Sequence, residues 1–307
     1  MKRVLVVGEL NVDLILHGAS AFPVPGKEVL VDDFVMTLGS ASAICAVGLA
    51  RLGVPIAFLS RVGRDPWGDY CLDALERAGI DVTRVERSPR LKTGVTVSIS
   101  SPQDRALVSY LGAISALVGA DVSDATFAGF QHLHVSAYYL QHGLRPDLPA
   151  LFERASRHGL TTSLDPGFDP QEAWGPEIRD ALRHADLFFP NEVELMALTR
   201  TSDCVGALRA LDNGRTRVIA KLGAQGALAL EAGVPVGVSA FPVTPVDTTG
   251  AGDSFNAGFI DAWLRERPLL ECLRRGAACG ALSTRAAGGT GSQATPAEVD
   301  SLLRDRA

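Results

Sequence analysis

Short apolar runs alternate with segments of helical periodicity along most of this 307-residue chain, and this alternation limits the possible folds more than any other feature. The runs that predict interior strands are 4–7, 56–60, 132–135, 161–164, 187–189 and 218–221. Helical patterns lie between or beside them, at 41–52, 67–78, 147–158, 176–184 and 193–198. Because parallel strands need crossover connections, this order predicts an α/β fold with a doubly wound, mostly parallel sheet flanked by helices.

Two regions interrupt the alternation. Residues 12–37 and 94–111 contain apolar positions in strand-like patterns with no helix signal between them. The turn expected at 101–104 makes the second region a hairpin. The pattern alone leaves two interpretations open: edge strands of the main sheet, or a small antiparallel sheet apart from it.

Charge and cysteine usage narrow the classes of protein. The formal net charge is −6 and the isoelectric point is near 5.5, so we expect no nucleic-acid partner. The five cysteines are scattered without CxxC spacing, which argues against a disulfide framework or a zinc site and favours a reducing, cytoplasmic compartment. No apolar stretch reaches the roughly 18 residues that span a bilayer, so we expect no membrane association.

The run at 247–258, DTTGAGDSFNAG, carries the strongest chemical signal. Gly250, Ala251 and Gly252 leave the backbone almost bare just before a small, apolar helix pattern, so their N–H groups are suited to bind an anion. Asp253 lies in the same turn. A carboxylate beside an anion site suits proton removal during transfer of a charged group, although an acidic residue in a first helical turn is also favoured by the helix dipole alone.

This run closely resembles the signature D-T-x-G-A-G-D-x-F of the ribokinase-like (PfkB-type) carbohydrate kinases. The resemblance implies that Asp253 is the catalytic base and that Gly250, Ala251 and Gly252 form the anion hole for the transferred phosphoryl group. It also implies a single ribokinase-like α/β domain over residues 1–307. In that domain, strands at about 12–37 and 94–111 would form a small β-sheet lid over the substrate.

Two further segments have both a structural and a functional interpretation. Asn191 and Glu194 form a capping-box pattern at a helix start. They also resemble the N-x-x-E motif of the family, which implies that Glu194 orients Mg²⁺ through its water shell and that Asn191 lies near the nucleotide. Lys221, Gly223 and Gly226 end a strand as a simple turn would, but they also resemble a segment that lines the nucleotide site.

The substrate end is predicted after the first strand, where ligands gather in open α/β sheets. Asn11 and Asp13 share one face there, and an amide beside a carboxylate suits vicinal sugar hydroxyls. Gly39 and Ser40 occupy the Gly-Gly of the family's N-terminal signature, and Ile44 replaces its sugar-facing Asn. We therefore expect a substrate that lacks a hydroxyl at that point, carries an apolar group there, or differs from ribose.

Several remaining positions have lesser roles. Asp247 and Thr249 match positions that hold K⁺ in some relatives, with further ligands expected from 285–292. His132 and His134 flank one residue on a strand, but no third metal ligand is evident, and Cys45 lies in an apolar helix pattern. We expect a satisfied surface or core role for the two histidines and a packing role for Cys45. The resemblance alone implies a homodimer through the lid.

The function predicted is an ATP- and Mg²⁺-dependent phosphotransferase acting on a hydroxyl of a small sugar or sugar-like molecule, of the ribose, fructose, ketodeoxygluconate or nucleoside class. The alternative is a non-catalytic sugar or nucleotide sensor that retains the kinase fold. A dinucleotide-dependent oxidoreductase is disfavoured because no G-x-G-x-x-G follows the first strand. Lys27, Arg90 and Arg105 are available near the lid for a phosphorylated sugar, although an unphosphorylated one is slightly favoured.

Overall fold

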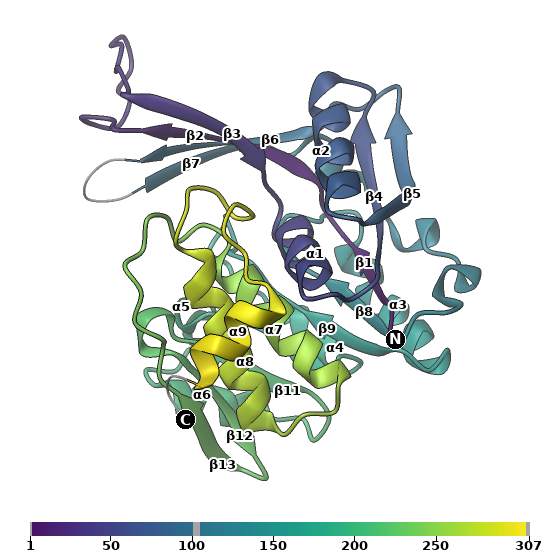
Figure 1. Cartoon of the computed structure of the whole chain (residues 1–307). Helices are drawn as coiled ribbons and strands as arrows, with labels where there is room; N and C mark the ends of the chain where they lie inside the picture. Colours follow the sequence, from purple (N-terminus) through teal and green to yellow (C-terminus); the bar gives the residue numbers. More distant parts are fainter. Residues whose placement is uncertain (1, 101–104, 305–307) are drawn as a thin grey trace.

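The computed structural model describes residues 2–100 and 105–304, so the turn expected at 101–104 lies outside the described residues. Within them, the main sheet has nine strands (Figure 1). Their spatial order is β13 (Val234–Val238), β12 (Ala227–Glu231), β11 (Arg217–Lys221), β10 (Leu187–Phe188), β9 (Thr161–Leu164), β8 (His132–Val135), β1 (Val4–Val7), β4 (Ile56–Gly63) and β5 (Asp81–Ser88). The pairings from β5 through β11 are parallel, and β12 and β13 are added antiparallel.

Helices cover both faces of this sheet, which confirms the doubly wound arrangement. One face packs against α1 (Ala41–Arg51), α2 (Pro66–Arg77), α7 (Ala251–Leu264), α8 (Leu269–Ser283) and α9 (Pro296–Arg304). The other packs against α3 (Leu148–Arg157), α4 (Ile178–Leu182), α5 (Glu192–Thr199) and α6 (Cys204–Ala210). Short 3₁₀ turns lie at Gly112–Ala116, Gly119–Asp121, Asp124–Phe127, Arg145–Asp147 and Gly223–Gln225. Among the helices described, none has the length and apolar character needed to cross a membrane.

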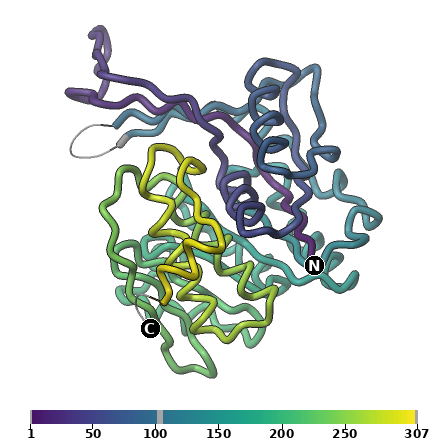
Figure 2. Tube along the Cα trace, in the orientation of Figure 1, coloured from purple at the N-terminus to yellow at the C-terminus, as the bar shows by residue number. Residues whose placement is uncertain are grey.

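The two irregular regions form a separate four-stranded sheet, which settles the choice left open by the sequence pattern. Its order is β3 (Asp33–Leu38), β2 (Asn11–His17), β6 (Gly94–Ser100) and β7 (Arg105–Tyr110). The outer pairs are antiparallel and the central pair, β2 with β6, is parallel. Figure 2 shows this small sheet projecting from the main body, with β2 and β6 side by side although they lie far apart in the sequence.

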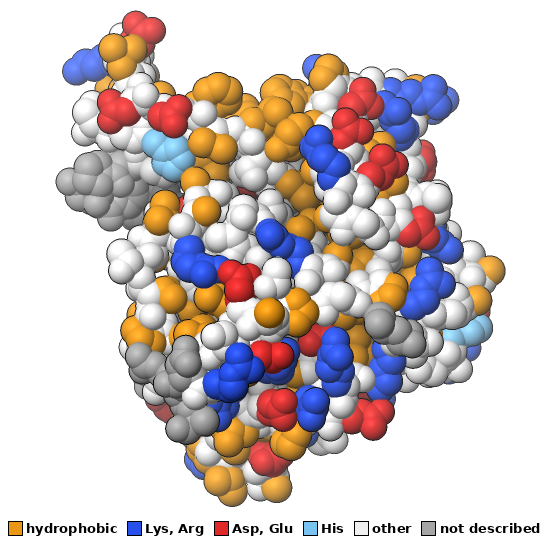
Figure 3. Space-filling view, in the orientation of Figure 1, with side chains coloured by type: hydrophobic (Ala, Val, Ile, Leu, Met, Phe, Trp, Pro, Cys, Tyr) orange, Lys and Arg blue, Asp and Glu red, His pale blue; other side chains and the backbone are white. Residues whose placement is uncertain are grey.

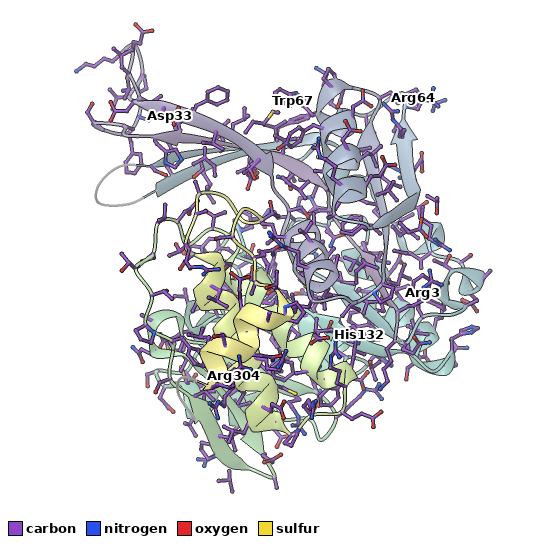
Figure 4. All side chains as sticks on the ribbon, in the orientation of Figure 1. Arg3, Asp33, Arg64, Trp67, His132 and Arg304 are labelled. Atoms are coloured by element: carbon purple, nitrogen blue, oxygen red, sulfur yellow. The ribbon has the colours of Figure 1, made fainter. Side chains whose placement is uncertain are left out.

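The two strand histidines lie in the core, joined in a chain of hydrogen bonds. His132 contacts Thr161 Oγ1 at 2.8 Å and Ser163 Oγ at 2.7 Å, and His134 contacts the same Ser163 Oγ at 2.7 Å and Ser136 Oγ at 2.8 Å. Figure 4 labels His132 within the body of the main sheet, whereas Asp33 lies out on the small sheet. Both histidine side chains are fully buried, and the described residues contain no cluster of three or more metal-ligating side chains. Of the surface and core roles expected for these histidines, the structure shows the core role.

Because these histidines are buried in the neutral form, we expect the protein to lose stability in mild acid. Burial lowers the pKa of His132 to about 3 and that of His134 to about 4, below the unfolded value near 6.5. The contribution of these neutral histidines to the free energy of unfolding is therefore complete above pH 6.5. It falls as the unfolded chain takes up protons below that pH, by about 1.4 kcal/mol per pH unit for each histidine that stays neutral. Urea unfolding between pH 7 and pH 4.5 measures the slope. His132→Gln should flatten it, whereas the exposed His142→Gln should leave it steep; equal slopes in all three proteins would contradict the prediction.

Candidate active site

A cavity of about 780 Å³ lies where the small sheet meets the carboxyl ends of the main strands. The main sheet reverses its winding at β1, which has β4 on one side and β8 on the other. Ligands in open α/β sheets bind outside such a switch point. The cavity accordingly collects Glu9 and Asn11 after β1, Ala137 after β8 and Gly167 after β9, together with Asp253 at the start of α7.

The α7 N-terminus is built for a close backbone approach. Gly250 precedes the helix with φ 71°, and a Cβ on it would lie 2.8 Å from Gly289 Cα and 2.9 Å from Ile44 Cγ2, so only glycine fits. No side chain caps this helix. The Ala251 N–H donates to the Thr248 carbonyl at 3.2 Å, so the N–H groups of Gly252 and Asp253, in the first turn of the helix, are the ones best suited to bind an anion.

Asp253 is surrounded by like charges. Part of the residue remains accessible from the cavity, yet burial raises its pKa well above the usual value. Asp165 adds to the rise, Glu9 and Glu194 contribute further, and Lys221 opposes it. A carboxylate held this way is a stronger base than an exposed one, which suits proton abstraction from an alcohol.

A buried ion pair lies beneath the helix start. Lys221 Nζ is 2.5 Å from Asp165 Oδ2, and the same oxygen accepts from Asn256 Nδ2 at 2.6 Å. The ammonium also approaches the anion hole, because a Cβ on Gly252 would lie 3.3 Å from Nζ. Asp165 joins the end of β9 to β11 and α7, but it was not among the site residues predicted from the sequence. Its position directly after the predicted strand 161–164 was the available signal.

Glu9 is a second carboxylate that the sequence analysis missed. Its carboxylate accepts from Ser42 N at 3.0 Å and from Ser42 Oγ at 2.5 Å, and Ser40 Oγ donates to the Glu9 carbonyl at 2.6 Å. Burial raises the pKa of Glu9 even so. Ser40, which stands where the family has a second glycine, holds φ 71°, a conformation that costs a non-glycine residue energy. Its hydroxyl contacts offset that strain.

Three of the four predicted substrate residues, Asn11, Asp13 and Ser40, line the same cavity as Asp253. Asn11 Nδ2 donates to Asp13 Oδ1 at 2.9 Å, so the pair is already aligned. Gly39 permits this arrangement, because a Cβ there would lie 2.1 Å from that Asp13 oxygen. Ser40 and Ile44 also line the cavity, and Ile44 presents an apolar surface there.

The predicted nucleotide residues lie outside this cavity, so far as the described residues show. Asn191 and Glu194 form a complete capping box, with N–H to oxygen distances of 2.8 and 2.9 Å. Burial, with Asp165 adding to it, raises the pKa of Glu194 to about 7. Packing alone requires glycine at 226, because φ is 105° and a Cβ there would lie 1.9 Å from the Val238 carbonyl oxygen. Gly223, at φ 55°, is exposed in the same turn.

Asp247 joins the signature to the loop expected to complete a cation site. Its carboxylate accepts from Thr249 N and Gly288 N, each at 2.8 Å. The adjacent Val246 N donates to the Thr284 carbonyl at 2.7 Å. Two segments about 40 residues apart are therefore tied together beside the start of α7.

Comparison with known proteins agrees with this geometry. The family profile described as pfkB family carbohydrate kinase matches residues 1–296. The chain is 30% identical to a ribokinase of Haemophilus influenzae (98% of each chain covered) and 32% identical to a 2-dehydro-3-deoxygluconokinase of Bacillus subtilis (89% and 88%).

Solved structures extend the comparison to bound ligands. A putative ribokinase II from E. coli, solved in complex with ATP and Mg²⁺, superposes with a TM-score of 0.85 at 25% identity over all of both chains. A Vibrio cholerae fructokinase double mutant bound to fructose, ADP and a potassium ion superposes with a TM-score of 0.81 at 28% identity, over 99% of this chain and 98% of that one. With its ribokinase-like fold and a family match spanning nearly its whole length, the chain belongs to the PfkB family and is a carbohydrate kinase.

Proposed function

We propose that this kinase transfers the γ-phosphoryl group of ATP to a hydroxyl of a small sugar or sugar-like substrate held between Asn11, Asp13 and Asp253. The observation that carries the proposal is that one cavity contains both the aligned amide–carboxylate pair on β2 and the carboxylate at the start of α7. Residues 1–307 act as one catalytic domain in this proposal, and the small sheet (12–37 and 94–111) covers the sugar as a lid.

In the proposed step, Asp253 accepts the proton of the substrate hydroxyl. The substrate oxygen bonds to the γ-phosphorus as the bond from that phosphorus to ADP breaks. Backbone N–H groups at the start of α7 stabilise the charge on the transferring oxygens, and the nearby Lys221 ammonium adds positive charge beneath them. Closure of the cavity excludes water, which would otherwise compete as the acceptor.

The nucleotide and its metal are assigned to the α5 and β11 ends, by Asn191, Lys221, Gly223 and Gly226. Mg²⁺ commonly uses one or two protein carboxylates together with phosphate oxygens and water. Glu194 fits that role, because its buried carboxylate lies close enough to Asp165 and Lys221 to feel their charges. When bound, Mg²⁺ supplies positive charge to the phosphate oxygens.

A monovalent cation is proposed at Asp247 and Thr249. The Asp247 carboxylate, which accepts from Gly288 N, would provide oxygen ligands beside the start of α7, and further ligands are expected from the loop at 285–292. The turnover rate should fall by about tenfold or more when K⁺ is replaced by a large organic cation, since the loss of charge beside the transferring group raises the barrier. Steady-state rates at constant ionic strength make the comparison; an unchanged rate would reject the site.

A homodimer through the lid is proposed from its exposed apolar side chains. Phe34 (59% exposed), Val108 (62%) and Tyr110 (55%) all lie on the small sheet. Figure 3 shows hydrophobic side chains gathered across the upper part of the molecule, where that sheet lies. Light scattering should give twice the chain mass of 32.4 kDa, and Val108→Glu should return the mass to that of one chain. A monomeric parent protein would end this proposal.

The decisive experiment is an ATP-consumption screen with Mg²⁺ and K⁺ present. The acceptor panel holds ribose, fructose, 2-dehydro-3-deoxygluconate and nucleosides, and Asp253→Asn is assayed beside the parent. Turnover that needs both a panel member and Asp253 supports the proposal. If panel members bind but none is phosphorylated in an Asp253-dependent way, the protein is a sensor that retains the kinase fold.

A further inference from the structure

One side of the cavity has no role in the proposed phosphoryl transfer. Tyr139, His142 and Arg145 reach it from the segment after β8, and Phe168, Asp169 and Gln171 reach it from the segment after β9. None of them belongs to the sugar-binding pair or to the α7 start. A substrate that fills this cavity therefore touches a second set of groups, whose chemistry constrains what it carries.

Arg145 is a cation without a carboxylate partner. Among the described residues it forms no ion pair, and its guanidinium lies over the Tyr138 ring, 5.8 Å from the centroid. Asp169 lines the same cavity, but its carboxylate accepts N–H bonds from the backbone of 171, 173 and 174 at 2.9–3.0 Å. A half-buried guanidinium that has no carboxylate partner is suited to bind an anionic group.

Tyr139 adds a hydroxyl that also has no partner. The residue is 4% exposed, and its Oη is buried with no hydrogen-bond partner among the described residues. Its ring is fixed edge-on against Tyr138 and Trp174, at centroid distances of 5.1 and 5.3 Å. Because this Oη has almost no accessible surface, Tyr139 contributes a packed ring to the cavity wall and leaves Arg145 as the polar group beside it that can reach a ligand.

Away from the start of α7, the acidic side chains of the cavity disfavour an anion. Glu9, Asp13 and Asp253 all line it, and the pKa values of Glu9 and Asp253 are raised by burial. An acidic substituent near these residues would add like charge to a site already short of solvent. Apart from the start of α7, which the proposed function assigns to the transferred phosphoryl group, Arg145 is the only Lys or Arg among the described residues that line the cavity. An acidic substituent is therefore favoured at Arg145, and this orients the whole substrate.

We propose that the preferred substrate is a sugar bearing an anionic group, a carboxylate or a phosphate, which Arg145 binds while a hydroxyl remote from that group is presented to Asp253. The inference rests on the proposed kinase function. The transfer itself is unchanged: the remote oxygen gains the phosphoryl group, ADP leaves, and Asp253 takes the proton. What is added is the charge of the substrate and the choice of hydroxyl.

The test compares acidic and neutral acceptors in matched pairs. 2-Dehydro-3-deoxygluconate against fructose tests the carboxylate, and ribose 1-phosphate against ribose tests the phosphate. For the preferred acid, Arg145→Gln should raise KM by about 10- to 100-fold with little change in kcat. The same change should not raise KM for the neutral partner. Arg157→Gln, which removes an exposed arginine on α3, should leave all values unchanged.

Stability and binding measurements separate the possible failures. Arg145→Gln should lower the melting temperature little, because Arg145 forms no ion pair among the described residues, and Arg145→Lys should recover part of the affinity. Equal or better use of neutral sugars or nucleosides, with KM insensitive to Arg145→Gln, would overturn this inference and leave the kinase proposal intact. If the anionic sugars bind calorimetrically to the parent and to Asp253→Asn, but are not phosphorylated by either, the proposed function fails instead.

Discussion

Replacing Asp253 with asparagine should lower kcat by about 10²- to 10⁴-fold, the range that a positioned general base contributes. Asparagine keeps the shape and the hydrogen-bonding oxygen but cannot accept the substrate proton. The helix start and its N–H groups remain, so KM for ATP should change little. Steady-state kinetics with a saturating acceptor measure the effect, and a loss smaller than tenfold would remove Asp253 from the role of base.

The same substitution should make the free protein more stable at neutral pH. The folded-state pKa of Asp253 lies above its unfolded value, so the ionised carboxylate destabilises the fold once the pH exceeds the unfolded pKa. A neutral amide removes that cost and the repulsion from Asp165. The melting temperature should therefore rise as activity falls. Asp261→Asn on the same helix is the matched control: it loses a 2.8 Å ion pair with Arg265, so it should lose stability and keep activity.

Replacing Asp165 with alanine should destabilise the protein by about 3–5 kcal/mol, the usual cost of leaving one member of a buried ion pair alone. The Lys221 ammonium would keep its charge in a buried site without its 2.5 Å partner, and the Asn256 amide would lose its acceptor. Urea unfolding at pH 7.5 measures the difference. Asp180→Ala, which removes an exposed pair with Arg183, should cost less than about 1 kcal/mol.

A double-mutant cycle identifies the source of that loss. Lys221→Met added to Asp165→Ala should recover part of the stability, because no unpaired buried charge remains. Additive losses would mean that Asp165 acts through its backbone contacts and not through the ion pair. Asp165→Asn should also move the acidic limb of the pH–rate profile to lower pH, since the charge on Asp165 contributes to the raised pKa of Asp253.

The strand–helix alternation predicted most of the fold because interior parallel strands are buried on both faces and so read as apolar runs. The predicted strands 4–7, 132–135 and 161–164 have the observed bounds of β1, β8 and β9. Strand β5 was missed because it lies at the sheet edge, where polar residues such as Arg84 and Glu86 replace an apolar run. Helices α8 and α9 were not predicted either, although α8 packs along α7 through buried residues such as Leu273.

The sequence predicted those parts of the candidate site whose residues lie close together along the chain. The start of α7 and the Asn11–Asp13 pair each lie within one short segment, so spacing alone indicates their geometry. The role of Asp165 is indicated only by its ion pair with a residue distant in sequence, and that of Arg145 only by its surroundings in the folded chain. No spacing rule links Asp165 to a lysine 56 positions later, because that contact depends on how β9 and β11, on either side of β10, end at the same edge of the sheet.

In the proposed function, the attachment of Asn11 and Asp13 to the small sheet has a kinetic consequence. Asn11 and Asp13 belong to β2, whereas Asp253 belongs to a helix packed on the main sheet. Any movement of the small sheet would therefore change the contacts to the sugar and the distance from the sugar to Asp253 together. We expect that affinity and alignment cannot be altered separately, and that the opening which releases product also separates the reacting groups. The same coupling would limit the hydrolysis of ATP by water when no sugar is bound.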